Sequence, residues 1–211
     1  AASARTANDQ LSGAAPFAKF LPVKASQQEE IEDGRVMSTF GSDSLVEAYR
    51  FVLARIKRGE NIKVLNLSLA VSCEAVTASE KQLLNELAAA GVSIVVAAGN
   101  AGIDTDTASF CPASLDVPGL ISVANVTPRG DLHLTSNFGA KTITTAAPGT
   151  VAFGVNGKLL TGTSMAAPLV SGVVALMYAA QPLLSPKDVQ AILLQSAKVS
   201  APRTRVRSGG V

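Results

Sequence analysis

The segment from Val92 to Ala98, VSIVVAA, constrains the fold of this chain more than any other stretch. It carries no charge and is apolar at every position but the serine. A short, uninterrupted apolar run is typical of a strand that is covered on both faces of a parallel sheet. Because amphipathic helical stretches alternate with such β-branched runs, we predict an α/β fold in which helices sandwich a mostly parallel sheet.

The other elements are predicted from the spacing of apolar residues and from turn residues. A helical spacing begins at Asp43, with Asp43 or Ser42 as its N-cap, and Gly59 follows its end. The predicted strands span residues 19–24, 63–69, 92–98 and 120–126, with one or two more within 132–147; the predicted helices span 43–58, 77–90, 164–180 and 185–197; a polar loop covers 26–33, and Asn156-Gly157 forms a tight hairpin turn.

Length and composition favour one globular domain. The 211 residues suit a single α/β domain, and a hydrophobic fraction of 47% excludes a disordered chain. We assign residues 1–199 to this domain and residues 200–211, which carry Arg203, Arg205 and Arg207, to a basic, frayed tail.

Charge and aromatic content exclude several classes of partner. The net charge is only +2, and the basic tail supplies that excess, so a nucleic-acid partner is not expected. Aromatic residues make up 4% of the chain and Trp is absent, which argues against stacking platforms. The stretch between Lys158 and Lys187 is uncharged, but Pro168 and Gly172 interrupt it. We interpret it as a buried helix and expect no membrane span.

The sharpest local motif is Gly162-Thr163-Ser164-Met165, which leads into that helix. A serine at a helix start can present its hydroxyl to a cleft, where the helix N-terminus stabilises developing negative charge. The alternative is an ordinary N-cap serine, which the motif alone does not exclude. The pattern is not the Gly-x-Ser-x-Gly elbow, and no histidine follows Ser164, so an α/β-hydrolase is not expected.

Two strand ends carry further candidate residues. Asn100 follows the apolar run, and an asparagine at the carboxyl end of a parallel strand points toward the crevice where such folds bind ligands. Its amide can donate to an oxyanion, although an asparagine in a turn beside glycine is the plainer interpretation. The segment from Asn66 to Ala70 can offer its backbone edge to an extended peptide.

These segments, together with other short motifs in one order, resemble the subtilisin-like serine proteases, the subtilase or peptidase S8 family. The resemblance covers nearly the whole chain. The additional motifs are Gly13-Ala14-Ala15-Pro16, Pro112-Ala113-Ser114, Ser136-Asn137-Phe138-Gly139 and Ala147-Pro148-Gly149. The resemblance implies a three-layer sandwich around a mostly parallel sheet, a polypeptide substrate and an extracytoplasmic or secreted location.

The resemblance also implies roles for single residues. Ser164 matches the nucleophile and Asn100 the amide of the oxyanion hole. The positions that match substrate-binding residues are Gly41 and Ser42 on one strand, Ser68, Leu69 and Ala70 on the opposing strand, Ala98 and Gly99 on a further pocket wall, and Thr163 beside the nucleophile.

The family order is Asp, then His, then Ser, and this chain lacks the first two motifs. Its only histidine, His133, lies in a segment that looks like a strand after a Gly-Asp turn, and we interpret it as a surface or packing residue. We therefore expect the chain to be the C-terminal part of a serine endopeptidase domain, inactive alone, whose missing N-terminal segment supplies Asp, His and a central strand. The alternative is a catalytically silent module that binds a peptide or partner protein in the same cleft.

Other departures concern the pocket and metal binding. Ala70 stands where the family usually has glycine, and we expect its methyl group either to narrow the primary pocket or to push the substrate backbone outward. The resemblance implies a cis bond between Cys111 and Pro112 and places Cys73 and Cys111 around one pocket, either as a disulfide or as separate thiols. The loop from Asn8 to Gly13 is shorter than the family's calcium-binding version, so we expect no metal site, with calcium binding as the alternative. The resemblance implies no organic cofactor. We interpret Asp104 and Asp106 as turn formers.

Overall fold

A parallel sheet of four strands forms the centre of the computed structural model, which describes residues 13–31, 35–39, 41–149, 152–153, 159–196 and 206–207. The strands are β3 (Val64–Leu67), β5 (Ser93–Ala97), β7 (Ile121–Val126) and β8 (Thr145–Pro148), in that spatial order. All three neighbouring pairs are parallel, which confirms the prediction of a mostly parallel sheet.

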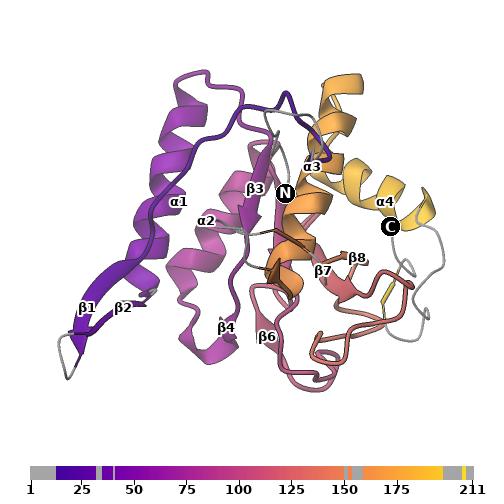
Figure 1. The fold of residues 1–211 in the computed structure, drawn as a ribbon. Coiled ribbons are helices and arrows are strands. Elements are labelled where there is room, and N and C mark those ends of the chain that lie inside the picture. The colour runs from indigo at the N-terminus through magenta and orange to yellow at the C-terminus, as the bar shows by residue number, and fades with distance from the viewer. Residues whose placement is uncertain are drawn as a thin grey trace.

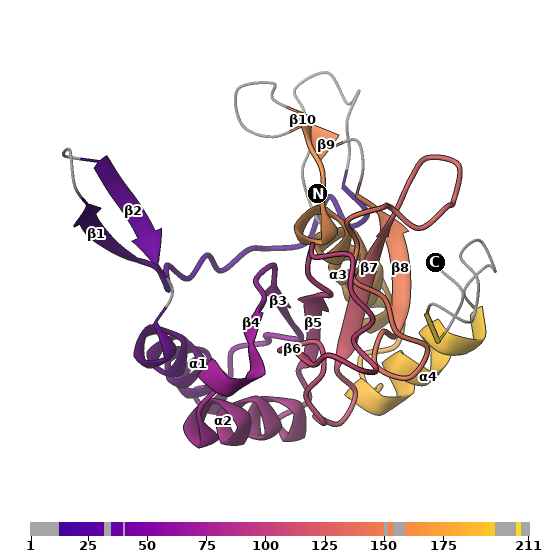
Figure 2. The same cartoon turned by 90° about the horizontal axis from the view of Figure 1, so that it is seen from below.

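Helices cover both faces of the sheet (Figures 1 and 2). On one face lie α1 (Ser42–Lys57) and α2 (Ala78–Ala89), and on the other lie α3 (Thr163–Ala180) and α4 (Pro186–Ser196). Ile94 and Val96 of β5 pack on the side of α1 and α2, whereas Val95 and Ala97 pack on the side of α3 and α4. The predicted three-layer sandwich is therefore confirmed, with one apolar core on each face of the sheet.

The four helices agree with prediction to within one or two residues because each combines regular apolar spacing with clear end signals. Gly59 and Gly91 follow α1 and α2 with positive φ values of 90° and 86°, which ends each helix in the left-handed conformation. Thr77 and Glu80 form a complete capping box at the start of α2. The N-cap of α1, however, is Gly41 and not the predicted Ser42 or Asp43.

The predicted strand at 19–24 is wrong, as is the polar loop at 26–33. Residues 18–26 run extended without strand pairing, and Phe17 and Phe20 are 84% and 67% exposed. The chain pairs one step later, where β1 (Gln27–Ile31) and β2 (Arg35–Thr39) form an antiparallel hairpin that projects from the body (Figures 1 and 2). Apolar composition predicts a strand only where a neighbouring backbone can complete the ladder, and none lies beside 19–24 in the described residues.

Short pairs complete the fold. An antiparallel pair joins β4 (Val71–Ser72) to β6 (Phe110–Cys111), and the 3-10 helix η2 (Cys73–Ala75) follows β4. Another joins β9 (Ala152–Phe153) to β10 (Leu159–Leu160), while the predicted turn at Asn156-Gly157 between them lies outside the described residues. Within the segment 132–147, where we predict one or two strands, the structure has one, because β8 begins there at Thr145.

Of the basic tail, only residues 206 and 207 are described. Val206 is fully buried, and the Arg207 backbone N–H donates to the Ile143 carbonyl at 2.9 Å. At these two positions the expectation of a frayed tail is wrong, because an apolar side chain reaches the core shared with α1 and α2. The other tail residues, 200–205 and 208–211, lie outside the described part of the chain.

By length and composition alone, α3 could cross a membrane, with a mean hydropathy of 1.5. It instead packs along all four strands of the central sheet, and 44% of its length is buried there. A core helix of an α/β domain passes the same test of length and composition, so we retain the interpretation of α3 as a core helix.

Candidate active site

Ser164 lies in the first turn of α3 and is half-buried. Its hydroxyl donates to the Ser68 carbonyl at 3.2 Å, and the Ser68 hydroxyl donates in return to the Ser164 carbonyl at 2.9 Å. This reciprocal pair joins the start of α3 to the residue just beyond β3. The candidate nucleophile and the candidate substrate-binding strand are thus in direct contact.

Asn100 lies just beyond β5 and contacts the residue before Ser164. Its Oδ1 atom accepts hydrogen bonds from the Thr163 backbone N–H at 2.9 Å and from the Thr163 hydroxyl at 3.1 Å. The Thr163 hydroxyl oxygen in turn accepts from the Gly99 N–H at 3.2 Å. Because Oδ1 is engaged by the helix start, the side-chain NH2 is the half of the amide that remains to donate to a ligand. Ser164 and Asn100 lie at the same end of the parallel strands.

Gly162 allows this close approach. Its φ is 152°, and a Cβ atom at this position would lie 3.1 Å from the Asn100 Oδ1 atom and 3.3 Å from Nδ2. A larger residue here would meet the amide that faces the site. The glycine in the 162–165 motif therefore has a packing role that is independent of the serine.

Asn137 holds the loop that carries Asn100, and it is fully buried. Its Nδ2 donates to the Ala98 carbonyl at 2.9 Å, and its Oδ1 accepts from the N–H groups of Ala101 at 2.9 Å and Ile103 at 3.2 Å. In the sequence, Asn137 stands out only as part of the motif Ser136-Asn137-Phe138-Gly139. A buried amide that satisfies the backbone on both sides of Asn100 is a positioning residue for it.

A second polar chain supports the end of β3. The Ser171 hydroxyl of α3 donates to Asn66 Oδ1 at 2.9 Å, and Asn66 Nδ2 donates to the Ser68 hydroxyl at 3.0 Å. This chain continues to the Ser164 carbonyl through Ser68. The signal for Asn66 was present in the segment Asn66–Ala70, but nothing in the sequence pairs it with Ser171, which lies 105 residues away.

The remaining pocket-wall candidates also lie close to these residues in the chain. Ala98 and Gly99 are buried, and Leu69 and Ala70 are half-buried before β4. The expected cis bond between Cys111 and Pro112 is confirmed. Cys73 and Cys111 form a disulfide with a Cα–Cα distance of 4.9 Å, which resolves the open alternative about these thiols.

Gly41 and Ser42 do not form the expected strand. Gly41 caps α1, Ser42 begins that helix, and the Ser42 hydroxyl donates to the Glu80 carboxylate and lies 3.1 Å from the Thr77 hydroxyl. Because α1 already begins at Ser42, neither residue is available for the expected substrate-binding strand. Ser42 contacts the start of α2, and none of its side-chain hydrogen bonds in the described residues reaches β3 or α3.

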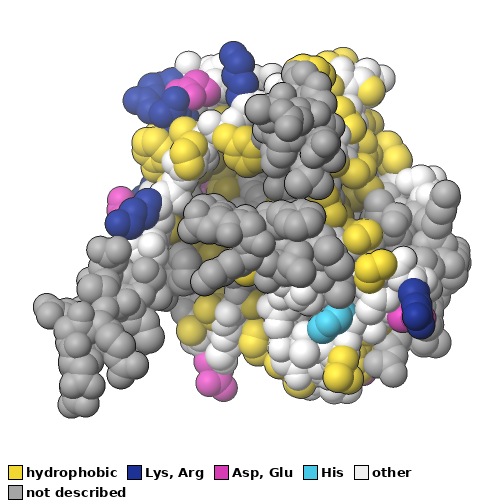
Figure 3. Space-filling view, in the orientation of Figure 1, with side chains coloured by type: hydrophobic (Ala, Val, Ile, Leu, Met, Phe, Trp, Pro, Cys, Tyr) yellow, Lys and Arg dark blue, Asp and Glu magenta, His cyan; other side chains and the backbone are white. Residues whose placement is uncertain are grey.

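His133, the only histidine, reaches the molecular surface, where it is cyan in Figure 3. Its Nδ1 atom lies 3.0 Å from the Thr135 hydroxyl, and its backbone N–H donates to the Asn125 carbonyl at 2.9 Å. These contacts fix it in the turn that follows β7. They fit a surface role, and the described contacts of its ring do not include Ser164.

Asp104 and Asp106 organise the long loop after β5. Asp104 Oδ1 accepts from the Asp106 N–H at 2.9 Å, so the interpretation of Asp104 as a turn former is confirmed. Asp106 Oδ1 accepts from the N–H and hydroxyl of Thr142, at 2.9 Å and 2.8 Å, and therefore ties this loop to the segment before β8. Among the described residues, no three His, Cys, Asp or Glu side chains form a group suited to a metal ion.

The Asp106 carboxylate makes the stability of this loop pH-dependent. Desolvation favours the neutral acid, but hydrogen bonds from Thr142 and the backbone of Lys141 and Ala140 outweigh it and lower the pKa below 3.8. A carboxylate whose pKa is lowered by folding stabilises the fold above the pKa of the unfolded chain. This stabilisation is lost as the pH falls through the pKa of the folded chain. We expect Asp106→Asn to lower the melting temperature at pH 7, with the difference narrowing toward pH 3. A difference that stays constant between these pH values would contradict the assignment.

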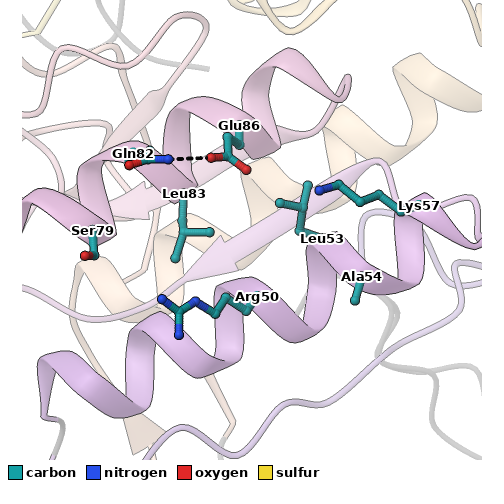
Figure 4. A pocket seen from close by; sticks show the side chains of 8 residues that line it. All are labelled: Arg50, Leu53, Ala54, Lys57, Ser79, Gln82, Leu83 and Glu86. Atoms are coloured by element: carbon teal, nitrogen blue, oxygen red, sulfur yellow. Dashed lines mark hydrogen bonds between the residues drawn. The ribbon is translucent and has the colours of Figure 1, made fainter.

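Two hollows lie away from the residues described above. One, of about 350 Å³, lies between α1 and α2, where Arg50 and Lys57 face Gln82 and Glu86 above Leu53 and Leu83 (Figure 4). The other, of about 440 Å³, lies between the loop 113–120 and the start of α4. Neither is lined by Ser164, Asn100 or Ser68, so the candidate site is defined by its hydrogen bonds and strand ends.

Comparison with known proteins gives one consistent family. The sequence model of the subtilase family matches residues 1–210. The extracellular basic protease of Dichelobacter nodosus is 29% identical over 207 residues, which cover 88% of this chain and 32% of that protein. Subtilisin-like protease 2 of Plasmodium falciparum (isolate 3D7) is 35% identical over 118 residues, which cover 54% of this chain and 8% of that protein. The chain thus spans a third or less of the length of these two relatives.

A solved structure gives the same fold. The crystal structure of a cold adapted subtilisin-like serine proteinase superposes with a TM-score of 0.68 and 23% sequence identity. The match covers 85% of this chain and 64% of the neighbour. At this identity the likeness establishes the fold alone, which is the parallel sheet between two helical layers.

Proposed function

Because the chain belongs to the subtilase family, we propose that it carries the nucleophile and oxyanion half of a serine endopeptidase site. The observation that supports this most is the junction of three segments at one sheet edge. Ser164 bonds to Ser68, and Asn100 bonds to Thr163 beside it. Nucleophile, oxyanion donor and substrate strand are the parts that acyl transfer requires on one side of the scissile bond.

In the proposed reaction the Ser164 hydroxyl attacks the scissile carbonyl carbon, and its proton passes to a base. The Asn100 NH2 donates to the oxygen that becomes negative in the tetrahedral intermediate. When the C–N bond breaks, the base returns the proton to the leaving amine, and water then hydrolyses the acyl group on Ser164. A hydroxyl, an amide and a base suffice for these steps, so we propose no redox or organic cofactor.

The base is the part that this chain does not provide in the described residues. The only histidine is held at Thr135, so we propose that an Asp- and His-bearing segment of the same domain completes the site. Two surfaces that the described residues leave without a partner support this proposal. β3 is an outer strand of the central sheet, and α3 leaves Leu176 50% exposed on the helix that carries Ser164. A strand and an apolar helix face match these two surfaces.

The rival function is a silent module that binds a peptide in the same cleft, favoured by the single histidine outside the site. A secreted or extracytoplasmic location fits either function. It is supported by the extracellular relative and by the Cys73–Cys111 disulfide, since disulfides persist in oxidising compartments.

The coding sequence that precedes Ala1 separates the two functions. We expect it to encode Asp and His motifs, and we expect the extended protein to cleave a protein substrate such as casein while the 211-residue chain does not. In the extended protein, Ser164→Ala is expected to lower turnover by about 10⁶, the loss known for the subtilisin nucleophile. Upstream sequence without an acid and a histidine, or cleavage by the extended protein that persists in Ser164→Ala, would reject the endopeptidase.

A further inference from the structure

The aromatic ring of Phe110 lies against the backbone of Gly99, one of the candidate pocket-wall residues. A Cβ atom on Gly99 would meet Asn137 Nδ2 and would lie 2.9 Å from Phe110 Cδ1 and 3.1 Å from Cε1, so the buried amide and the ring together occupy the space that a side chain there would need. Gly99 has a φ of 101° and donates its N–H to the Thr163 hydroxyl. The ring therefore packs on the residue next to Asn100 and within two hydrogen-bonded steps of Ser164.

The backbone of Phe110 is held from several sides. Phe110 pairs with Ser72 across the β4–β6 ladder, and its N–H donates to the Ser114 hydroxyl at 3.1 Å. The next residue, Cys111, pairs with Val71 and is bonded to Cys73. Pairing, the hydrogen bond to Ser114 and the disulfide therefore hold the backbone of Phe110 and Cys111 in place beside Gly99.

The same ladder sets the position of the ring relative to the opposite wall. β4 continues directly from Ser68-Leu69-Ala70, the segment that contacts Ser164. The ring of Phe110 lies beside Gly99, and the Phe110 backbone pairs with Ser72, two residues beyond Ala70. The side chain of a bound peptide residue would enter this same space.

We propose that Phe110 fills the inner part of the primary pocket and restricts it to small side chains. The substrate class is a polypeptide with Gly, Ala or Ser at the residue whose carbonyl Ser164 attacks. This inference rests on the proposed peptide site, and it applies whether the chain is part of an enzyme or a binding module. An aromatic ring that fills the pocket excludes large side chains by steric overlap. For comparison, one extra or missing methylene in a hydrophobic pocket changes discrimination by about 10- to 200-fold.

The test measures binding and needs no catalytic base. Fluorescein-labelled tetrapeptide acids, Ala-Ala-Ala-Ala and Ala-Ala-Ala-Phe, are titrated against the 211-residue chain by fluorescence polarisation. We expect the Ala-ended peptide to bind at least tenfold more tightly to the wild-type chain. Phe110→Ala is expected to reverse this preference by opening the pocket, whereas Phe51→Ala, on the outer surface of α1, leaves it unchanged.

The outcomes separate the inference from the function on which it rests. Equal or tighter binding of the Phe-ended peptide to the wild-type chain overturns the role of Phe110 and leaves the peptide site intact, even where Phe110→Ala fails to fold. An unchanged preference in a folded Phe110→Ala variant overturns it as well. Absence of binding of both peptides to every variant overturns the peptide site together with this inference.

Discussion

Replacing Asn137 with leucine is expected to lower the free energy of unfolding by about 3 kcal/mol or more, which is a large part of the total for most domains. The change removes one donor and one acceptor that serve three backbone partners: the buried carbonyl of Ala98 and the part-buried N–H groups of Ala101 and Ile103. Each buried group left without a partner costs about 1 to 3 kcal/mol. Leucine shares the branching of asparagine at Cγ and is larger, so it leaves no cavity, and its extra volume adds a packing cost to the loss of the hydrogen bonds.

Denaturant unfolding of the wild-type chain and of Asn137→Leu measures this effect. Asn85→Leu is the matched control, because Asn85 is exposed on α2 and bonds only to Lys81 within its own helix. We expect the control to change stability by less than about 1 kcal/mol, as is usual for surface positions. A similar small change for Asn137→Leu would mean that the loop carrying Asn100 is held by other contacts.

The second large effect concerns the surfaces that we assign to the proposed Asp- and His-bearing segment. The peptide encoded directly before Ala1 is expected to bind the chain and raise its melting temperature by about 10 °C or more. Pairing at β3 satisfies backbone groups along Val64–Leu67, and burial at α3 covers Leu176. Several kcal/mol from these two surfaces correspond to such a shift, since about 1 kcal/mol moves the melting temperature of a chain of this size by about 2 to 4 °C.

Thermal melts with the peptide and with a peptide of the same composition in scrambled order decide this prediction. The scrambled peptide keeps charge and hydropathy but cannot match the alternation of β3, so it is expected to leave the transition unchanged. A cooperative transition at high temperature, indifferent to both peptides, would show that the 211 residues are a self-sufficient fold and that β3 needs no partner.

The helices and the central strands were predictable because their signals are local. The uncharged, apolar composition of Val92–Ala98 is enough to predict a buried strand. Gly59 ends α1 because it adopts a left-handed backbone conformation. The failure at residues 19–24 has the opposite cause. Its apolar side chains suit a strand, but a strand also requires a partner backbone, and that partner is a property of the assembled fold.

The candidate site divides in the same way. Ser164 and Asn100 stand at element ends that the sequence marks, so the sequence alone is enough to make them candidates. Phe110 gave no signal, because its contact with Gly99 depends on the pairing of β4 with β6. Asn137 likewise bonds to residues 34 to 39 positions away, a separation that no local pattern reports.

We propose Ser164 as a nucleophile that lacks its base in this chain, and the rate at which a fluorophosphonate labels Ser164 measures this property. We expect slow labelling of the 211-residue chain, because a neutral serine hydroxyl without a base is a weak nucleophile. In the protein extended through the upstream Asp and His motifs, we expect rapid labelling that Ser164→Ala abolishes. Rapid labelling of Ser164 in the 211-residue chain would show that a base is already present, and a Ser164 that stays unlabelled in the extended protein would contradict its role as nucleophile.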